Sequence, residues 1–350
     1  MISARLFAAS VLALAVLPSN PGLAASVTDS AGRTATVPGT ISRVYAAGPP
    51  ASILLYVLAP DRLTGWPRAP HAYERPYLAE AYRDLPETGR LTGRGDTANL
   101  EIILRNKPDL IFDFGSIRDT YISLADRTQQ QTGIPYLLID GRFENTASAL
   151  RLMGRALGAG ERAEQLARYV EALFAELDEA LAKIPEDERP RVYLARGPDG
   201  LETGLKGSIN TEIIERAGGR NVADPGPDST LRRGITQVSI EQVIVANPDT
   251  ILTWDRNFFD QVWTNPLWAN IEAVRRKRIY LAPTAPFGWI DRPPSINRII
   301  GLKWLAGLFY PDHFDFDLRG ETRKFYKLFY HVDLSDEELD RLIEWASGRP

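Results

Sequence analysis

The sequence predicts an α/β protein with two Rossmann-like lobes, each built on a mainly parallel sheet, joined by a single long α-helix. Two observations carry this prediction. The first is an internal repeat, in which two pairs of similar segments recur at nearly equal offsets. The second is a long amphipathic helical region between the repeats.

Composition limits the classes of function that the chain can serve. Its 350 residues suffice for two domains, and the 44% hydrophobic and 25% charged residues are typical of globular proteins. The net charge of −4 gives no basic excess that would favour nucleic acid. The absence of cysteine excludes disulfides, thiolate metal sites and cysteine nucleophiles.

Residues 1–25 have the features of a cleaved secretory signal peptide. One cation, Arg5, precedes an apolar run over residues 6–17, and Pro18 with several small residues follows. This run of 12 residues is too short to span a bilayer as a helix. We expect cleavage within Gly22–Ala25, no lipid anchor because no cysteine stands at the junction, and a soluble periplasmic protein.

The N-terminal lobe, expected over residues 26–145, contains a strand at Val44–Ala46. RVYAAGPP (Arg43–Pro50) matches RVYLARGP (Arg191–Pro198) in the second half, and both segments break at a Gly-Pro turn that leads towards a helix. This first pair of matching segments predicts a strand, a turn and a helix in each lobe.

The second pair of matching segments is LEIILRNKPDLIF (Leu100–Phe112) and IEQVIVANPDTIL (Ile240–Leu252). In each, a short helical stretch begins with an aliphatic and an acidic residue and ends before Pro-Asp. Pro108 and Pro248 end the helices because proline lacks an N–H and disfavours helix at the preceding residue. The aliphatic residues that follow predict short buried strands.

The linking region is expected over residues 146–186, with Thr146 as the N-cap of its first helix. Gly158–Gly160 interrupts the helical pattern, which resumes from Glu161 to Ile184 with apolar residues at helical spacing. These residues would form a rod of about 36 Å, ended by Pro185. A rod between the lobes would let them rock only slightly. The C-terminal lobe is expected over residues 187–350.

The order of these segments resembles the iron-siderophore and vitamin B12 class of periplasmic substrate-binding proteins, which serve ABC importers. The resemblance extends over nearly all of the mature chain. Further segments that carry it are an opening hairpin (VTDSAGRTATVP), GIPYLLID, GAGERAEQL, INTEIIERAGGRNVA and WANIEAVRRKRIYLAP. It implies a ligand cleft between two lobes and a role in transport rather than catalysis.

The resemblance also implies a permease-docking role for two acidic residues. In that class, one glutamate on each lobe docks with arginines of the permease, and the matching motifs NLE and SIE assign this role to Glu101 and Glu241. An acid at a helix start also complements the helix dipole, which is a purely local explanation. We expect a monomer whose partner permease works with separate ATPase subunits.

Ligands of open α/β sheets bind beyond the carboxyl ends of the strands. The rule selects the loops after residues 44–46, 110–112, 192–194, 251–253 and 279–281, and the segments 66–68 and 93–96 can face the same cleft. The predicted ligand contacts are Gly48, Pro49, Trp66, Arg68, Arg94, Ser116, Arg118, Arg196, Trp254, Phe287 and Trp289.

Trp289 and Asp291, both in the loop PFGWIDRPP, are expected to have different roles. We expect Trp289 to contact the ligand, and Asp291 to cap a helix whose first turn contains Pro293 and Pro294. Aromatic faces and arginine forks suit an anionic metal chelate. The sequence thus predicts capture of an iron(III) chelate or similar metal complex, with no resident cofactor.

Alternatives stay open at this point. The arginines could be solvated surface charges, and the ligand could be molybdate, tungstate, cobalamin or haem. A bare-metal site is disfavoured because only His71, His313 and His331 are present. No hydrolase elbow, HExxH or Walker A motif indicates an enzyme. A subunit that only senses its ligand has the same sequence features.

Overall fold

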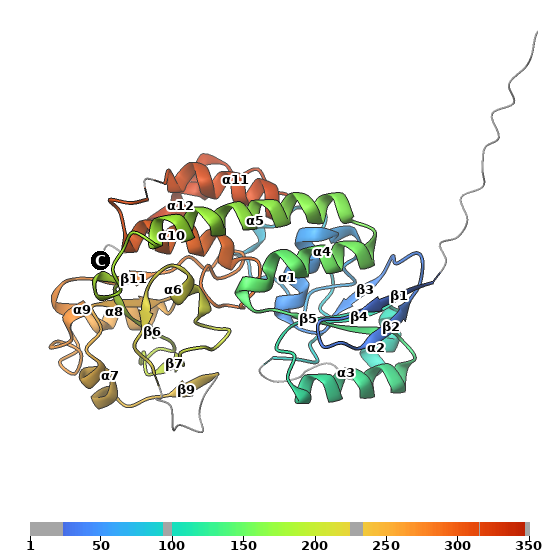
Figure 1. The fold of residues 1–350 in the computed structure, drawn as a ribbon, viewed down its shortest axis with the longest axis horizontal. Coiled ribbons are helices and arrows are strands. Elements are labelled where there is room, and N and C mark those ends of the chain that lie inside the picture. The colour runs from blue at the N-terminus through green and yellow to red at the C-terminus, as the bar shows by residue number, and fades with distance from the viewer. Residues whose placement is uncertain (1–23, 94–99, 225–233, 315, 347–350) are drawn as a thin grey trace, which may run out of the picture.

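A computed structural model describes residues 24–93, 100–224, 234–314 and 316–346. Two lobes lie side by side, and α5 (Gly160–Leu181) runs across them (Figure 1). This confirms the predicted fold class. Arg94 and nearly all of the predicted signal peptide lie outside the described residues.

The N-terminal lobe is built on a parallel sheet in the order β3-β4-β5. Val44 pairs with Leu110, and Ile111 pairs with Tyr136. The strands are almost wholly buried, as is usual for parallel sheets covered on both faces. Its elements are β1 (Ala25–Thr28), β2 (Thr34–Val37), β3 (Val44–Ala46), α1 (Pro49–Leu58), α2 (Leu100–Asn106), β4 (Leu110–Gly115), α3 (Asp119–Thr132), β5 (Tyr136–Asp140) and α4 (Thr146–Leu157).

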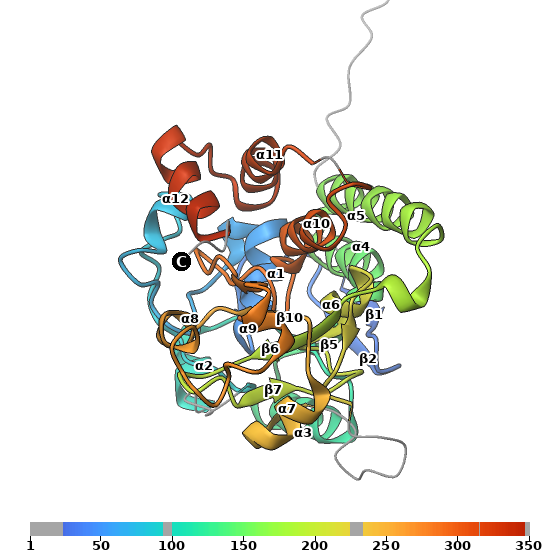
Figure 2. The ribbon, with the colours of Figure 1, turned by 90° about the vertical axis from the view of Figure 1, so that its left-hand side faces the viewer.

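The C-terminal lobe is built on a second parallel sheet, in the order β11-β10-β6-β8, beside an antiparallel pair of β7 and β9. Helices α10 and α11 return to lie on the same side of the molecule as α5, away from α3 and α7 (Figure 2). Its elements are β6 (Arg191–Ala195), β7 (Glu202–Gly204), α6 (Glu212–Arg216), β8 (Arg220–Asn221), β9 (Ile235–Gln237), α7 (Ile240–Ala246), β10 (Thr250–Thr253), α8 (Arg256–Val262), α9 (Glu272–Arg275), β11 (Ile279–Leu281), α10 (Arg298–Phe309), α11 (Leu318–Tyr330) and α12 (Asp336–Ala346).

The internal repeat extends to individual hydrogen bonds. Arg43, which precedes β3, donates through Nη2 to the carbonyl of Asn106 at the end of α2. Arg191, at the start of β6, donates through Nη2 to the carbonyl of Ala246 at the end of α7. In each lobe, the arginine at the equivalent position donates to a backbone carbonyl at the end of the helix. That carbonyl has no hydrogen-bond partner within the helix.

The linking region forms two helices, as the glycines predict. Gly158 ends α4 with φ of 65°, a left-handed conformation that favours glycine. Helix α5 then runs for 22 residues and buries Leu166, Val170 and Leu177. These residues belong to one hydrophobic core that includes side chains of both parallel sheets. The lobe limits at residues 145/146 and 186/187 stay predictions.

Candidate functional site

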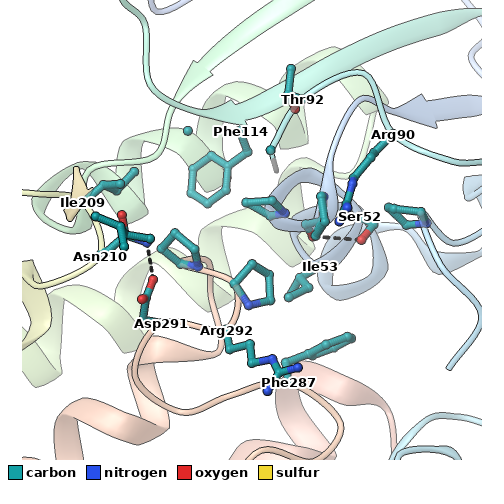
Figure 3. Close-up of a pocket in the computed structure, with 18 of the residues that line it drawn as sticks. Ser52, Ile53, Arg90, Thr92, Phe114, Ile209, Asn210, Phe287, Asp291 and Arg292 are labelled. Carbon is teal, nitrogen blue, oxygen red and sulfur yellow. Dashed lines mark hydrogen bonds between the residues drawn. The ribbon is translucent and has the colours of Figure 1, made fainter. Parts of the chain in front are cut away.

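A cleft of about 1260 Å³ lies between the lobes, at the carboxyl ends of the parallel strands. Figure 3 shows Thr92 and Phe114 on the N-terminal side, with Asn210, Asp291 and Arg292 on the opposite side. The lining includes the aromatic residues Trp66, Phe114, Tyr121, Trp254 and Phe287, and the cationic residues Arg68, Arg90, Arg118, Arg142, Arg196 and Arg292.

Most of the predicted ligand contacts line this cleft. Gly48 does not, because it lies behind the lining, where a Cβ would collide with Oγ1 of Thr92. Glycine at this position lets two loops approach closely. Ligand contact itself stays a prediction for the residues that do line the cleft: Pro49, Trp66, Arg68, Ser116, Arg118, Arg196, Trp254 and Phe287.

The placement expected for Trp289 is wrong. Its side chain is completely buried in the core and does not line the cleft. The ring packs edge-on against Trp304, and Nε1 donates to the hydroxyl of Tyr326 at 3.3 Å. A Cβ at Gly301 would collide with the carbonyl oxygen of Trp289, so this glycine allows α10 to approach the loop.

The role expected for Asp291 is also wrong. Helix α10 begins at Arg298 and is preceded by Asn297, so neither Asp291 nor Pro293 belongs to its first turn. Asp291 instead lines the cleft, and its carboxylate accepts a hydrogen bond from Nδ2 of Asn210 (Figure 3). Asp291 thus lines the cleft and Trp289 does not, which is the reverse of what the local sequence predicts.

The C-terminal wall of the cleft centres on Arg196. Its guanidinium stacks over Trp254, with 5.0 Å from Cζ to the ring centre. Nη1 lies 3.4 Å from Oδ2 of Asp291, and Nε lies 3.5 Å from Oε1 of Glu202. Burial raises the pKa of Asp291 to about 6, although Arg196 acts in the opposite direction. This wall therefore combines a stacked cation with one buried and one half-buried carboxylate.

The N-terminal wall contains a carboxylate at the end of β4, where Asp113 is 3% exposed. Its Oδ1 accepts hydrogen bonds from Oγ1 of Thr92 and from the amide of Phe114, both at 3.0 Å. Burial raises the pKa of Asp113 to about 6. Also in the cleft lining, Nε of Arg118 donates to Oγ of Ser116 at 3.0 Å.

Several residues that line the cleft were not predicted from the sequence. Asp113 carried a signal, because it interrupts the apolar strand LIFDFG at its carboxyl end. Arg90, Glu202 and Asn210 carried none, since they belong to segments that do not directly follow a strand of either parallel sheet.

A second pair of features lies outside the cleft, on the repeated helices. Glu101 and Glu241 are exposed in the first turns of α2 and α7. Three residues later, Leu104 and Ile244 are 49% and 43% exposed, which is unusual for large aliphatic side chains. The two lobes thus present the same combination of an acidic and an apolar side chain.

No helix of the described residues is both long enough and apolar enough to cross a bilayer. Within the same residues, no three His, Asp or Glu side chains are grouped so that they could hold a metal ion.

The profile of the periplasmic binding protein family matches residues 57–286. The chain belongs to this family. The structure is similar to an ABC transporter solute binding protein from Sulfurospirillum deleyianum DSM 6946, with a TM-score of 0.81 and 31% identity, covering 91% of this chain and 99% of the other. This binding protein is therefore a solute-binding component of an ABC transporter.

Two relatives are named for different ligands. The molybdate-binding protein MolA of Haemophilus influenzae is 26% identical over 90% of this chain and 93% of the relative. A vitamin B12-binding protein of Salmonella choleraesuis is 30% identical over 51% of this chain and 64% of the relative. The matched proteins are solute-binding proteins of one fold, but their ligands differ widely in size.

Proposed function

We propose that this binding protein captures an anionic iron(III) chelate, or a similar metal complex, and delivers it to the permease. The observation that carries the proposal is the cleft volume of about 1260 Å³. Common small-molecule sites measure roughly 300–1,000 Å³, so the cleft has room for a complete chelate. Trp66, Tyr121, Trp254 and Phe287 supply apolar faces for its organic part.

The cations of the lining supply the polar part of the proposal. Arg90, Arg118 and Arg292 line the cleft, and Arg292 lies alongside Phe287 (Figure 3). Guanidinium forks bind carboxylate or catecholate oxygens with two parallel hydrogen bonds. An aromatic surface beside such forks favours an anionic ligand that also has a large apolar area.

A small oxyanion is the second candidate, favoured by the similarity to MolA over 90% of the chain. Oxyanions in proteins are commonly held by backbone N–H groups at helix starts. Helix α1 begins at the cleft with Pro49 and Pro50, neither of which has an N–H to offer. This first turn is therefore poorly suited to an oxyanion, which supports the larger complex.

We further propose that Glu101 and Glu241 dock with basic residues on the two halves of the permease. Their support is the repeat: both are exposed, and each has an exposed aliphatic neighbour, Leu104 or Ile244. Paired charges set the orientation and register of a complex, and an adjacent apolar side chain adds buried area.

Thermal denaturation of the mature protein with a ligand panel tests the proposal. The panel contains ferric siderophores, ferric citrate, haem, cobalamin, molybdate and tungstate, each with its metal-free form where one exists. A bound ligand raises the melting temperature as its concentration exceeds the dissociation constant. We expect stabilisation by a ferric complex but not by its metal-free form. Stabilisation by molybdate or tungstate alone would reject the chelate in favour of the oxyanion.

A further inference from the structure

Asp113 differs from three other carboxylates that line the cleft. Glu74 pairs with Arg68, and Asp140 with Arg142. Among the described residues, no cation pairs with Asp113 and nothing donates to its Oδ2, because its two hydrogen bonds both reach Oδ1. The third, Asp291, has Arg196 beside it.

The surroundings of Asp113 contain a second unsatisfied polar group. The hydroxyl of Tyr136 is buried and has no hydrogen-bond partner among the described residues. Burial raises the pKa of Tyr136, and the nearby Asp113 adds to this effect. A buried carboxylate without a counter-charge and a buried hydroxyl without a partner both cost stability.

Among the described residues, nothing uses the negative charge at this position. The two hydrogen bonds from Thr92 and the Phe114 amide reach one oxygen, which an asparagine would also supply. Within the part of the chain that the structure describes, the buried charge therefore adds a desolvation cost without adding a hydrogen bond. Such a cost in the wall of a cleft is typical of a functional residue.

We propose that Asp113 contacts the ligand and selects complexes that carry a hydrogen-bond donor, such as an amide N–H, a hydroxyl or an ammonium group. The inference rests on the proposed function of the cleft and narrows its ligand class. A donor that reaches Oδ2 forms a charge-assisted hydrogen bond in a site with little water. An acceptor-only anion such as molybdate leaves the carboxylate unpaired and is repelled by it.

The two walls would then recognise different parts of one ligand. Arginines of the cleft bind its acidic oxygens, and Asp113 accepts a hydrogen bond from a donor group elsewhere on the complex. Amide-rich complexes of iron or cobalt satisfy both requirements, whereas a ligand that offers oxygens alone satisfies only the first.

Isothermal titration calorimetry at about pH 7.5, where Asp113 is ionised, tests the inference. The donor-bearing probes are ferric enterobactin, an anionic complex with amide N–H groups, and cobalamin. Ferric citrate and molybdate mainly present acceptors, and metal-free enterobactin is included. The variants are Asp113→Asn, which replaces Oδ2 by a donor, and the charge-matched control Asp109→Asn. Asp109 lies outside the cleft, where its carboxylate accepts hydrogen bonds from the amides of Ser42 and Arg43.

We expect Asp113→Asn to weaken a donor-bearing probe by about 10- to 100-fold without weakening molybdate, and Asp109→Asn to change the same affinity by less than about threefold. Cooperative thermal unfolding of each variant confirms that it is folded. Equal effects of the two substitutions, no effect of Asp113→Asn, or a wild type that binds neither donor-bearing probe would overturn the inference.

The same titrations distinguish a failure of the proposed function from a failure of the role inferred for Asp113. If metal-free enterobactin binds as tightly as its ferric form, the metal complex is rejected, while the effect of Asp113→Asn still decides the role of Asp113. If only ferric citrate binds, the metal-complex function stands and the donor-selecting role of Asp113 is rejected.

Discussion

The guanidinium carbon of Arg196 lies 5.0 Å from the centre of the Trp254 ring. The register of the sheet fixes this relationship, because Ala195 of β6 pairs with Thr253 of β10. Arg196 and Trp254 are the next residues of two adjacent parallel strands, and both line the cleft. The strands therefore hold an aromatic ring and a planar cation together before any ligand arrives.

Substitution of Trp254 by alanine should lower the affinity for an anionic ferric complex by about tenfold, since a cation–π contact contributes about 0.5–2 kcal/mol and the ligand also loses an apolar face. Calorimetric titration measures the change. The control is Trp263→Ala, because Trp263 packs on Phe259 and does not line the cleft. Equal losses of affinity in both variants would contradict a ligand contact at Trp254.

Trp289→Ala should destabilise the protein by about 3–5 kcal/mol, because it opens a cavity in the core. Chemical denaturation measures the free energy of unfolding. Trp289→Phe keeps most of the buried area and should cost less. The folded fraction of either variant should bind ligand normally, and a selective loss of affinity in Trp289→Phe would return this residue to the cleft.

The stability effect of Asp113 should depend on pH. Its folded pKa of about 6 is above the value of about 3.9 in an unfolded chain, so its favourable contribution is complete below the lower value and is lost as pH rises through the higher one. Asp113→Asn should therefore raise the free energy of unfolding by about 1–3 kcal/mol near pH 7.5, and change it little near pH 4. Denaturant titrations at both pH values check this, and a variant less stable than wild type near pH 7.5 would contradict it.

Charge reversal at both repeated helices, Glu101→Lys with Glu241→Lys, should raise the binding-protein concentration that half-activates the transporter by about tenfold or more. The measurement is ATPase activity of the reconstituted permease–ATPase complex. Glu176→Lys, on an exposed turn of α5, is the control. Ligand affinity should stay unchanged, and normal activation by the double variant would exclude docking through these helices.

Elements set by local sequence were predicted well, because their determinants are close together in the chain. Pro108 and Pro248 end α2 and α7 as expected, and the strand at Ile279–Leu281 has the predicted bounds. The loops after the strands were also placed correctly at the cleft, since that follows from the parallel topology alone.

The directions in which side chains of those loops point could not be predicted from local sequence. Trp289 is buried because Trp304 and Tyr326, from later helices, enclose its ring. Asp291 reaches the cleft beside Asn210 and Arg196, which are distant in sequence. Which residue of a loop points inward depends on such distant partners, and a single sequence does not reveal them.

The hydrophobic core that runs through both sheets and α5 has a consequence for the duplicated architecture. Although the two lobes repeat one pattern, neither is a self-sufficient folding unit. Cutting the chain between them would expose apolar side chains of Leu166, Val170 and Ile299, which are buried in the intact molecule. An isolated half should aggregate rather than persist as a smaller binding protein, and heating the whole molecule should melt both halves together.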